Sequence, residues 1–153
     1  DNAHLSTLEG LRGVTSVGRD PSGRSIFISN NTALESLVDL ASVTGGLPGS
    51  LTIQDNADLE TLEGLRGVTL VGTDNRGRSI VISANGALRS LAGLTGVKGR
   101  LPGSLTIGHN ANLLTLKGLE GVRHLGKDVG GRSIRIVANG ALRSVAGLAG
   151  VNG

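Results

Sequence analysis

The stretch Leu51-Thr-Ile-Gln-Asp-Asn56-Ala-Asp-Leu59-Glu-Thr-Leu62-Glu-Gly-Leu65-Arg-Gly-Val68 decides the fold. Its first three residues alternate apolar, polar, apolar, which is the period of a β-strand. After Asn56 an apolar residue returns at every third position, with glycine at the bends. That spacing is too tight and too rich in glycine for a good helix. The stretch therefore predicts a short strand followed by a chain that turns corners.

The same skeleton recurs along the whole sequence. Ile80-Val-Ile-Ser-Ala-Asn85-Gly-Ala-Leu88-Arg-Ser-Leu91-Ala-Gly-Leu94-Thr-Gly-Val97 repeats it, and pairs of such stretches form a unit that recurs at an offset of 54 residues. Repeats of this kind stack, because each one buries its apolar face only against its neighbours. We therefore predict one all-β solenoid of six leucine-rich coils over 1–153, in three tandem units, 1–54, 55–108 and 109–153.

Stacking of the coils is expected to place like residues over like residues in the interior. Each buried Leu or Ile would contribute roughly 1.5–3 kcal/mol relative to an exposed one. The predicted interior ladders run from Leu5 to Leu142, Leu8 to Val145, Leu11 to Leu148, Val14 to Val151, Ile26 to Ile134 and Ile28 to Ile136.

An asparagine stands at the same place in every coil. We expect these side chains to point inward, where each amide can bond backbone groups at the end of a strand, because an unpaired buried amide costs about 1–3 kcal/mol. The alternative is six exposed turn residues, but a surface turn would tolerate Asp, Ser or Gly in some copies. The predicted structural ladder is Asn2, Asn31, Asn56, Asn85, Asn110 and Asn139.

The outward positions of the strands are expected to face solvent or to form a contact surface. This possible contact face consists of Ser25, Phe27, Ser50, Thr52, Ser79, Val81, Ser104, Thr106, Ser133 and Arg135. A second hydroxyl ladder lies between the leucines, and we expect it to occupy tight corners and to bond nearby backbone. It consists of Thr7, Ser36, Thr61, Ser90, Thr115 and Ser144.

Three further features of the surface are open to interpretation. The longer loop opens with Asp and closes with Gly-Arg in each unit, for example Asp20-Pro-Ser-Gly-Arg24, as in ordinary turns. The arginine could reach back to the aspartate or to a neighbouring molecule. Asn30-Asn31-Thr32 is a sequon that makes Asn30 a possible N-glycosylation site. The three histidines share no spacing typical of a metal site, so no metal and no cofactor are expected.

Composition excludes several classes of function. The chain has 26 Gly, one Phe and no Cys, which removes disulfides and thiolate chemistry. Its net charge of +3 comes without a basic block or interleaved aromatic residues, which argues against nucleic-acid binding. No apolar run is long enough to span a membrane, so no membrane insertion of this segment is expected.

The pattern Leu-x-Ile-x-x-Asn-x-x-Leu-x-x-Leu-x-Gly-Leu resembles the leucine-rich repeat. It more closely resembles the receptor L-domain, a right-handed β-helix of growth-factor receptor ectodomains and related surface proteins. The resemblance covers all six coils and implies a right-handed β-solenoid, an extracellular or cell-surface location, and non-covalent recognition or assembly. The chain lacks the Cys-rich flanks of those receptors and its repeats are more regular, which argues against a hormone-receptor role.

Catalysis is not expected, because an active site is a singular constellation that breaks a repeat, whereas the polar positions here recur by threes.

We favour a structural protein that assembles with itself by end-to-end stacking, as a segment of a longer array or filament. The chain begins where a strand should precede it and stops where one should follow. The alternative is an adhesin or receptor-type ectodomain that recognises a glycan or a surface protein through its strand face. An ice-binding solenoid is a remote alternative, because Phe27, Val81 and Arg135 interrupt the hydroxyl array.

Overall fold

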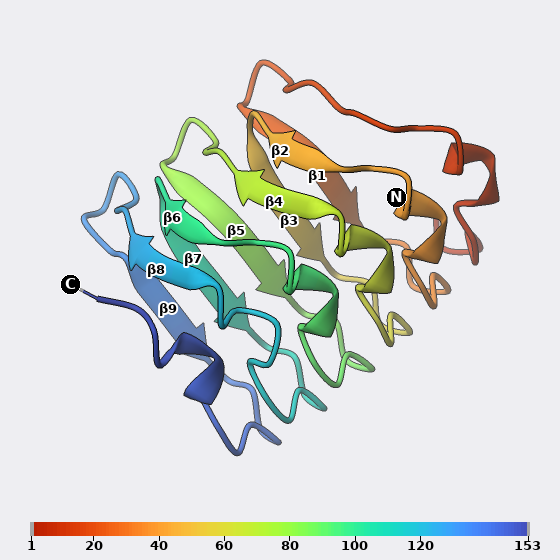
Figure 1. Ribbon diagram of the computed structural model, residues 1–153. Helices are drawn as coiled ribbons and strands as arrows, with labels where there is room; N and C mark the ends of the chain where they lie inside the picture. The colour runs from red at the N-terminus through yellow and green to blue at the C-terminus, as the bar shows by residue number, and fades with distance from the viewer. Residues whose placement is uncertain (1, 153) are drawn as a thin grey trace.

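The computed structural model describes residues 2–152 as an all-β solenoid (Figure 1). Asp1 and Gly153, the first and last residues of the predicted units, lie outside this range. The main sheet contains five parallel strands in the order β1 (Arg24–Ser29), β3 (Ser50–Gln54), β5 (Arg78–Ser83), β7 (Ser104–Gly108) and β9 (Ile134–Val137). The predicted all-β solenoid is thereby confirmed.

The coil count differs slightly from the prediction. The six repeated stretches give about five turns with a strand, because the described residues before β1 contain none. The first coil contributes only its corner and its loop, so the second coil is the first complete turn.

A second side of the solenoid carries two small parallel sheets that the sequence reading did not anticipate. β2 (Gly45–Leu47) pairs with β4 (Val68–Val71), and β6 (Gly99–Leu101) pairs with β8 (Val122–Leu125). The sequence signal for these two sheets is an apolar ladder that recurs with the same repeat. It consists of Val17, Leu47, Val71, Leu101 and Leu125, of which the middle three are buried.

The third side consists of single 3-10 turns, η1 (Glu9–Leu11), η2 (Val38–Leu40), η3 (Glu63–Leu65), η4 (Ala92–Leu94) and η5 (Ala146–Leu148). A hydroxyl of the second ladder precedes each of the last four turns and accepts a hydrogen bond from the backbone. The Val38 N–H donates to Ser36 Oγ at 3.1 Å, and the Glu63 N–H donates to Thr61 Oγ1 at 3.2 Å. The expected corner role of this ladder is confirmed.

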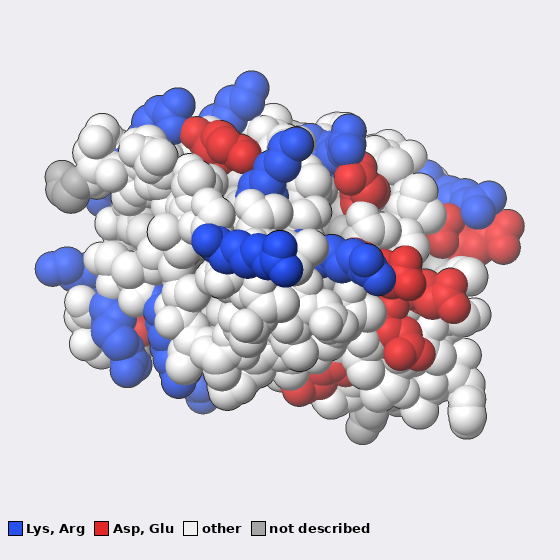
Figure 2. Space-filling view, turned by 90° about the horizontal axis from the view of Figure 1, so that it is seen from below, with Lys and Arg blue, Asp and Glu red and all other residues white. Residues whose placement is uncertain are grey.

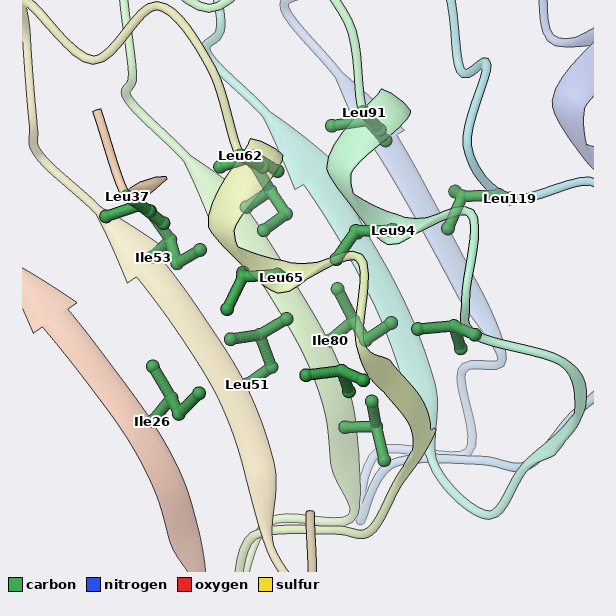
Figure 3. Close-up of a cluster of buried hydrophobic side chains, with 14 of the residues drawn as sticks. Ile26, Leu37, Leu51, Ile53, Leu62, Leu65, Ile80, Leu91, Leu94 and Leu119 are labelled. Carbon is green, nitrogen blue, oxygen red and sulfur yellow. The ribbon is translucent and has the colours of Figure 1, made fainter. Parts of the chain in front are cut away.

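Stacked leucine, isoleucine and valine side chains fill the interior (Figure 3). The middle members of each predicted ladder are fully buried, as Leu65 and Leu94 illustrate. The end members are not: Leu11 is 42% exposed, Ile134 44% and Val145 53%. This gradient follows from the architecture, because a coil is covered only by the coils on either side of it.

Glycines in the corners allow the coils to approach closely. In four coils a Cβ at the glycine would overlap the carbonyl oxygen of a leucine in the preceding coil. The pairs are Gly64 with Leu37, Gly93 with Leu62, Gly118 with Leu91 and Gly147 with Leu116. Gly10 occupies the same place in the first coil, where nothing lies within 4 Å of an added Cβ.

The second coil carries Asp39 where the others carry this glycine. The Asp39 side chain is buried and accepts hydrogen bonds from the Leu8 N–H at 3.1 Å and from Arg12 Nε at 2.7 Å. At this corner the first and second coils are therefore joined by a carboxylate, whereas backbone hydrogen bonds such as Thr44 N–H to Thr15 O at 3.1 Å join them elsewhere.

Candidate functional site

The asparagine ladder forms a continuous line of hydrogen bonds at the end of the main sheet. Asn56, Asn85 and Asn110 are fully buried, and the backbone N–H of each donates to the Oδ1 of the next asparagine along the ladder. Their amide groups also donate to strand carbonyls of the preceding coil, as from Asn85 Nδ2 to Ile53 O at 3.1 Å. These amides are occupied by the fold itself and are not available to a ligand.

The two ends of the ladder differ from its middle. Asn31 is buried and Asn139 half-buried, whereas Asn2 is exposed and donates from Nδ2 to Asn31 Oδ1 at 3.3 Å. Only the interior members therefore have coils on both sides.

The residue before each strand-following asparagine has a left-handed backbone, which the sequence reading missed. The φ angles are 56° at Asn30, 57° at Asp55, 53° at Ala84, 57° at His109 and 50° at Ala138. This conformation turns the chain at the end of each strand so that the next side chain points inward. Asn30, the possible glycosylation site, is exposed at such a turn.

The predicted contact face is wrong for five of its ten residues, which are buried: Ser50, Thr52, Ser79, Val81 and Ser104. The serines lie at coil corners, where Ser79 Oγ accepts a hydrogen bond from the Gly103 N–H at 2.9 Å. Thr52 and Val81 are flanked on both sides by side chains of adjacent strands about 4.8 Å away. Phe27 and Arg135 are exposed, and Ser25, Thr106 and Ser133 are intermediate.

A groove of about 340 Å³ lies on the outer face of the main sheet, toward its C-terminal strands. Four arginines line it, together with polar side chains and a few valines. We call it the arginine groove, and it is lined by Gln54, Arg76, Arg78, Val81, Ser83, Thr106, Gly108, His109, Asp128, Val129, Arg132, Arg135 and Val137.

The turn before β5 fixes one side of the groove. Asp74 Oδ1 accepts hydrogen bonds from the Arg76 and Arg78 N–H groups, both at 2.9 Å, and Asp74 Oδ2 pairs with Arg78 Nη2 at 2.6 Å. Burial alone would raise the pKa of Asp74, but these bonds outweigh it and hold the pKa below its usual range.

The same ion pair recurs in the other two units. Arg24 Nη2 lies 2.8 Å from Asp20 Oδ2, and Arg132 Nε lies 3.2 Å from Asp128 Oδ2. Backbone hydrogen bonds from Arg24 and Arg132 are the main cause of the lowered pKa values of Asp20 and Asp128. Each of these arginines therefore reaches back to the aspartate of its own turn.

The groove also contains two arginines without such a partner. Within residues 2–152, the side chains of Arg76 and Arg135 take part in no hydrogen bond or ion pair with the rest of the chain. Both are exposed, and the groove therefore carries uncompensated positive charge.

The groove lies where the side chains depart from the repeat, so the repeat pattern did not predict it. The place 54 residues earlier has a different set of side chains. The groove has Arg76 instead of Ser22, Arg135 instead of Val81, Gly108 instead of Gln54 and His109 instead of Asp55. Each of these four changes adds a cation, removes an acid or removes bulk, whereas Val129 and Val137 replace the polar Asn75 and Ser83.

The C-terminal end of the solenoid carries a second, apolar hollow of about 410 Å³. β9 pairs with β7 on one side only, so its other edge is free within the described residues. The lining includes Leu125, Ile134, Ile136, Val145, Leu148 and Val151.

His4, His109 and His124 are all exposed. Among residues 2–152, no group of three or more His, Asp or Glu side chains could hold a metal ion. No helix in that range is long and apolar enough to cross a membrane.

Comparisons with protein-family models, with curated proteins and with solved structures found no match to this chain.

Proposed function

We propose that the chain is a structural solenoid module of the receptor L-domain type that extends by stacking end to end with a second copy. The observation that carries the proposal is that the end coils expose the surface that inner coils bury. Leu11 is 42% exposed where its counterpart Leu65 is 0%, and Val145 is 53% exposed where Leu91 is 0%. A second copy seated on either end would bury these side chains in the way that inner coils already do.

The charge distribution favours a head-to-tail arrangement. Residues 1–83 contain ten acids and six Lys or Arg residues, whereas residues 84–153 contain two acids and nine Lys or Arg residues. Most acidic side chains gather toward the right of Figure 2, on the side where Figure 1 places the N-terminal coils. Unlike charges approach each other only when the N-terminal half of one copy meets the C-terminal half of another. A head-to-tail interface that does not close generates a filament.

Gly10 offers a test that leaves the fold intact. A Cβ at Gly10 meets open space in a single copy, but in a stack it would meet the preceding copy as Gly93 meets Leu62. Asp39 is accommodated at the equivalent place through hydrogen bonds from the Leu8 N–H and Arg12, which an alanine cannot accept. We expect the wild-type chain to lengthen with concentration in light scattering and electron micrographs. We expect Gly10→Ala to remain monomeric with an unchanged melting temperature.

Gly86→Ala is the matched control, since it lies in an inner coil and its added Cβ would meet only the Ala57 carbonyl oxygen, at an ordinary contact distance of 3.5 Å. It should assemble as the wild type does. A wild-type chain that stays monomeric at every concentration, or a Gly10→Ala variant that assembles normally, would overturn the proposal.

We further propose an extracellular or cell-surface location. Asn30 is exposed and Asn31 is buried, so Asn30 is the accessible asparagine of the sequon. Expression through a eukaryotic secretory pathway tests this: a glycosidase should reduce the mass of the wild type and not that of Asn30→Gln. A wild-type protein that is secreted without a glycan would remove this support for an extracellular location.

A second candidate function is ligand recognition through the outer face of the main sheet, as in an adhesin or receptor-type ectodomain. The arginine groove favours it, because the groove is concave and carries more positive charge than the smaller hollow at the equivalent place one unit earlier. The ice-binding alternative has less support, because several hydroxyls of its array are buried, among them Ser50, Thr52 and Ser104.

A further inference from the structure

We infer that the arginine groove binds an anionic oligosaccharide that carries at least two sulfate or carboxylate groups. The inference rests on the second candidate function and does not depend on end-to-end assembly.

The arginines provide the charge and the geometry for oxyanions. Arg78 and Arg132 are held in place by Asp74 and Asp128, whereas Arg76 and Arg135 have their guanidinium groups free. A guanidinium presents parallel N–H donors that match the oxygens of a carboxylate or sulfate. The fixed arginines receive an anion with little further side-chain ordering, whereas the free arginines offer all of their N–H donors.

The strand spacing sets the separation of the anionic groups. Arg78 begins β5 and Arg135 lies within β9, whereas Arg76 and Arg132 lie in the turns that precede these strands. β7 lies between these two strands, so Arg78 and Arg135 are separated by two strand steps, or roughly 10 Å across the sheet. The two turns contact each other directly, because the Val129 N–H donates to Arg76 O at 2.9 Å. A ligand that engages both Arg78 and Arg135 therefore carries two charges at least about that far apart.

The remaining lining suits a polyhydroxylated ligand. Gln54, Ser83, Thr106 and His109 offer hydrogen-bonding groups, and Gly108 leaves the middle of the floor low. The groove contains no Phe, Tyr or Trp side chain on which a nucleobase could stack, and such stacking supports most single-stranded nucleic-acid sites. The combination of arginines with hydroxyl and amide groups favours a charged sugar.

The repeat itself supplies an internal comparison. A surface that served only to cover the sheet would be expected to recur with the unit. Instead the copy 54 residues earlier carries Asp55 and Gln54 where the groove carries His109 and Gly108. The hollow at the earlier place is therefore less positive, and it is smaller, at about 280 Å³.

Isothermal titration calorimetry on the Gly10→Ala background, which is designed to stay monomeric, tests the inference. The probes are a heparin-derived tetrasaccharide, a tetragalacturonate, the neutral maltotetraose and inorganic sulfate. We expect one or both charged tetrasaccharides to bind, more weakly as salt increases, and the neutral sugar not to bind. Sulfate alone should bind at least tenfold more weakly, and the stronger of the two charged sugars identifies the anionic group.

Two groove variants and one matched control locate the site. Arg135→Val restores the residue type of Val81, and we expect roughly tenfold weaker binding from the loss of one charged contact. Gly108→Gln fills the floor without changing charge and should also weaken binding. Arg100→Val removes one positive charge from β6, on another sheet, and should leave binding unchanged.

Equal losses of affinity in Arg135→Val and Arg100→Val would mean diffuse charge attraction and would overturn the inference. Equal binding of the neutral sugar, or no binding of either charged sugar, would also overturn it. Arg135→Val keeps the test decisive if Gly108→Gln does not fold, because valine already occupies this position in the preceding unit. A negative result would leave the assembly experiment untouched, because Gly10 lies outside the groove.

Discussion

At the scale of single residues, the fold depends on left-handed backbone conformations at residues other than glycine. Ala84 and Ala138 have φ angles of 53° and 50°, in the left-handed region that glycine adopts freely and alanine does not. The sequence could not reveal this, because Asn30, Asp55 and His109 fill the same place in other coils and share no single signature. The inward asparagine that follows was readable, since it is invariant across the six copies.

Ala84→Gly is therefore expected to stabilise the protein. A left-handed alanine costs about 1–2 kcal/mol, whereas glycine costs about 0.5–1 kcal/mol in unfolded-chain entropy, so the net gain is about 0.5–1 kcal/mol. Urea unfolding measures it as a higher midpoint. Ala87→Gly, three residues away and without a positive φ, should instead lose stability. A lower midpoint for Ala84→Gly would contradict the strain argument.

At the scale of elements, apolar alternation located the strands of the main sheet, and the corner hydroxyls were correctly interpreted. Apolar alternation mispredicted the outer face of the sheet, because it assumes that every second residue of a strand is exposed to solvent. Ser79 instead accepts a hydrogen bond at a corner, and Thr52 is covered by its neighbours. The arginine groove was missed for a different reason, since Arg135 and Gly108 are departures from the repeat rather than parts of it.

The Asp74 turn is expected to give the fold a pH-dependent element. Its folded-state pKa lies below that of an unfolded aspartate, so its stabilisation is present above about pH 4 and is lost as the pH falls further. Asp74→Asn should lower the free energy of unfolding by about 1–3 kcal/mol at pH 7. The difference from wild type should shrink toward pH 2 in urea titrations. Asp55→Asn, at an exposed turn, serves as control and should show little change at either pH; a gap for Asp74→Asn that widens in acid would refute the sign.

At the scale of the whole molecule, stability passes from coil to coil, because each turn contacts only its neighbours. Gly93→Ala would drive a Cβ into the Leu62 carbonyl and separate two central coils. We expect a loss of about 3 kcal/mol or more, together with faster amide exchange in the coils on both sides. Gly10→Ala makes the same change at the end coil and should alter the free energy of unfolding by less than about 0.5 kcal/mol.

The contrast between these two glycines links the fold to its proposed use. They occupy equivalent places in the repeat, and only the coil on the N-terminal side distinguishes them. If a second copy supplies that coil, Gly10→Ala should be harmless in dilute monomer and should abolish the joint at concentrations where the wild type assembles. Chemical denaturation at increasing protein concentration measures this: the wild-type midpoint should rise while that of Gly10→Ala stays constant. A midpoint that is independent of concentration in both would mean that no copy of this chain covers the end coil.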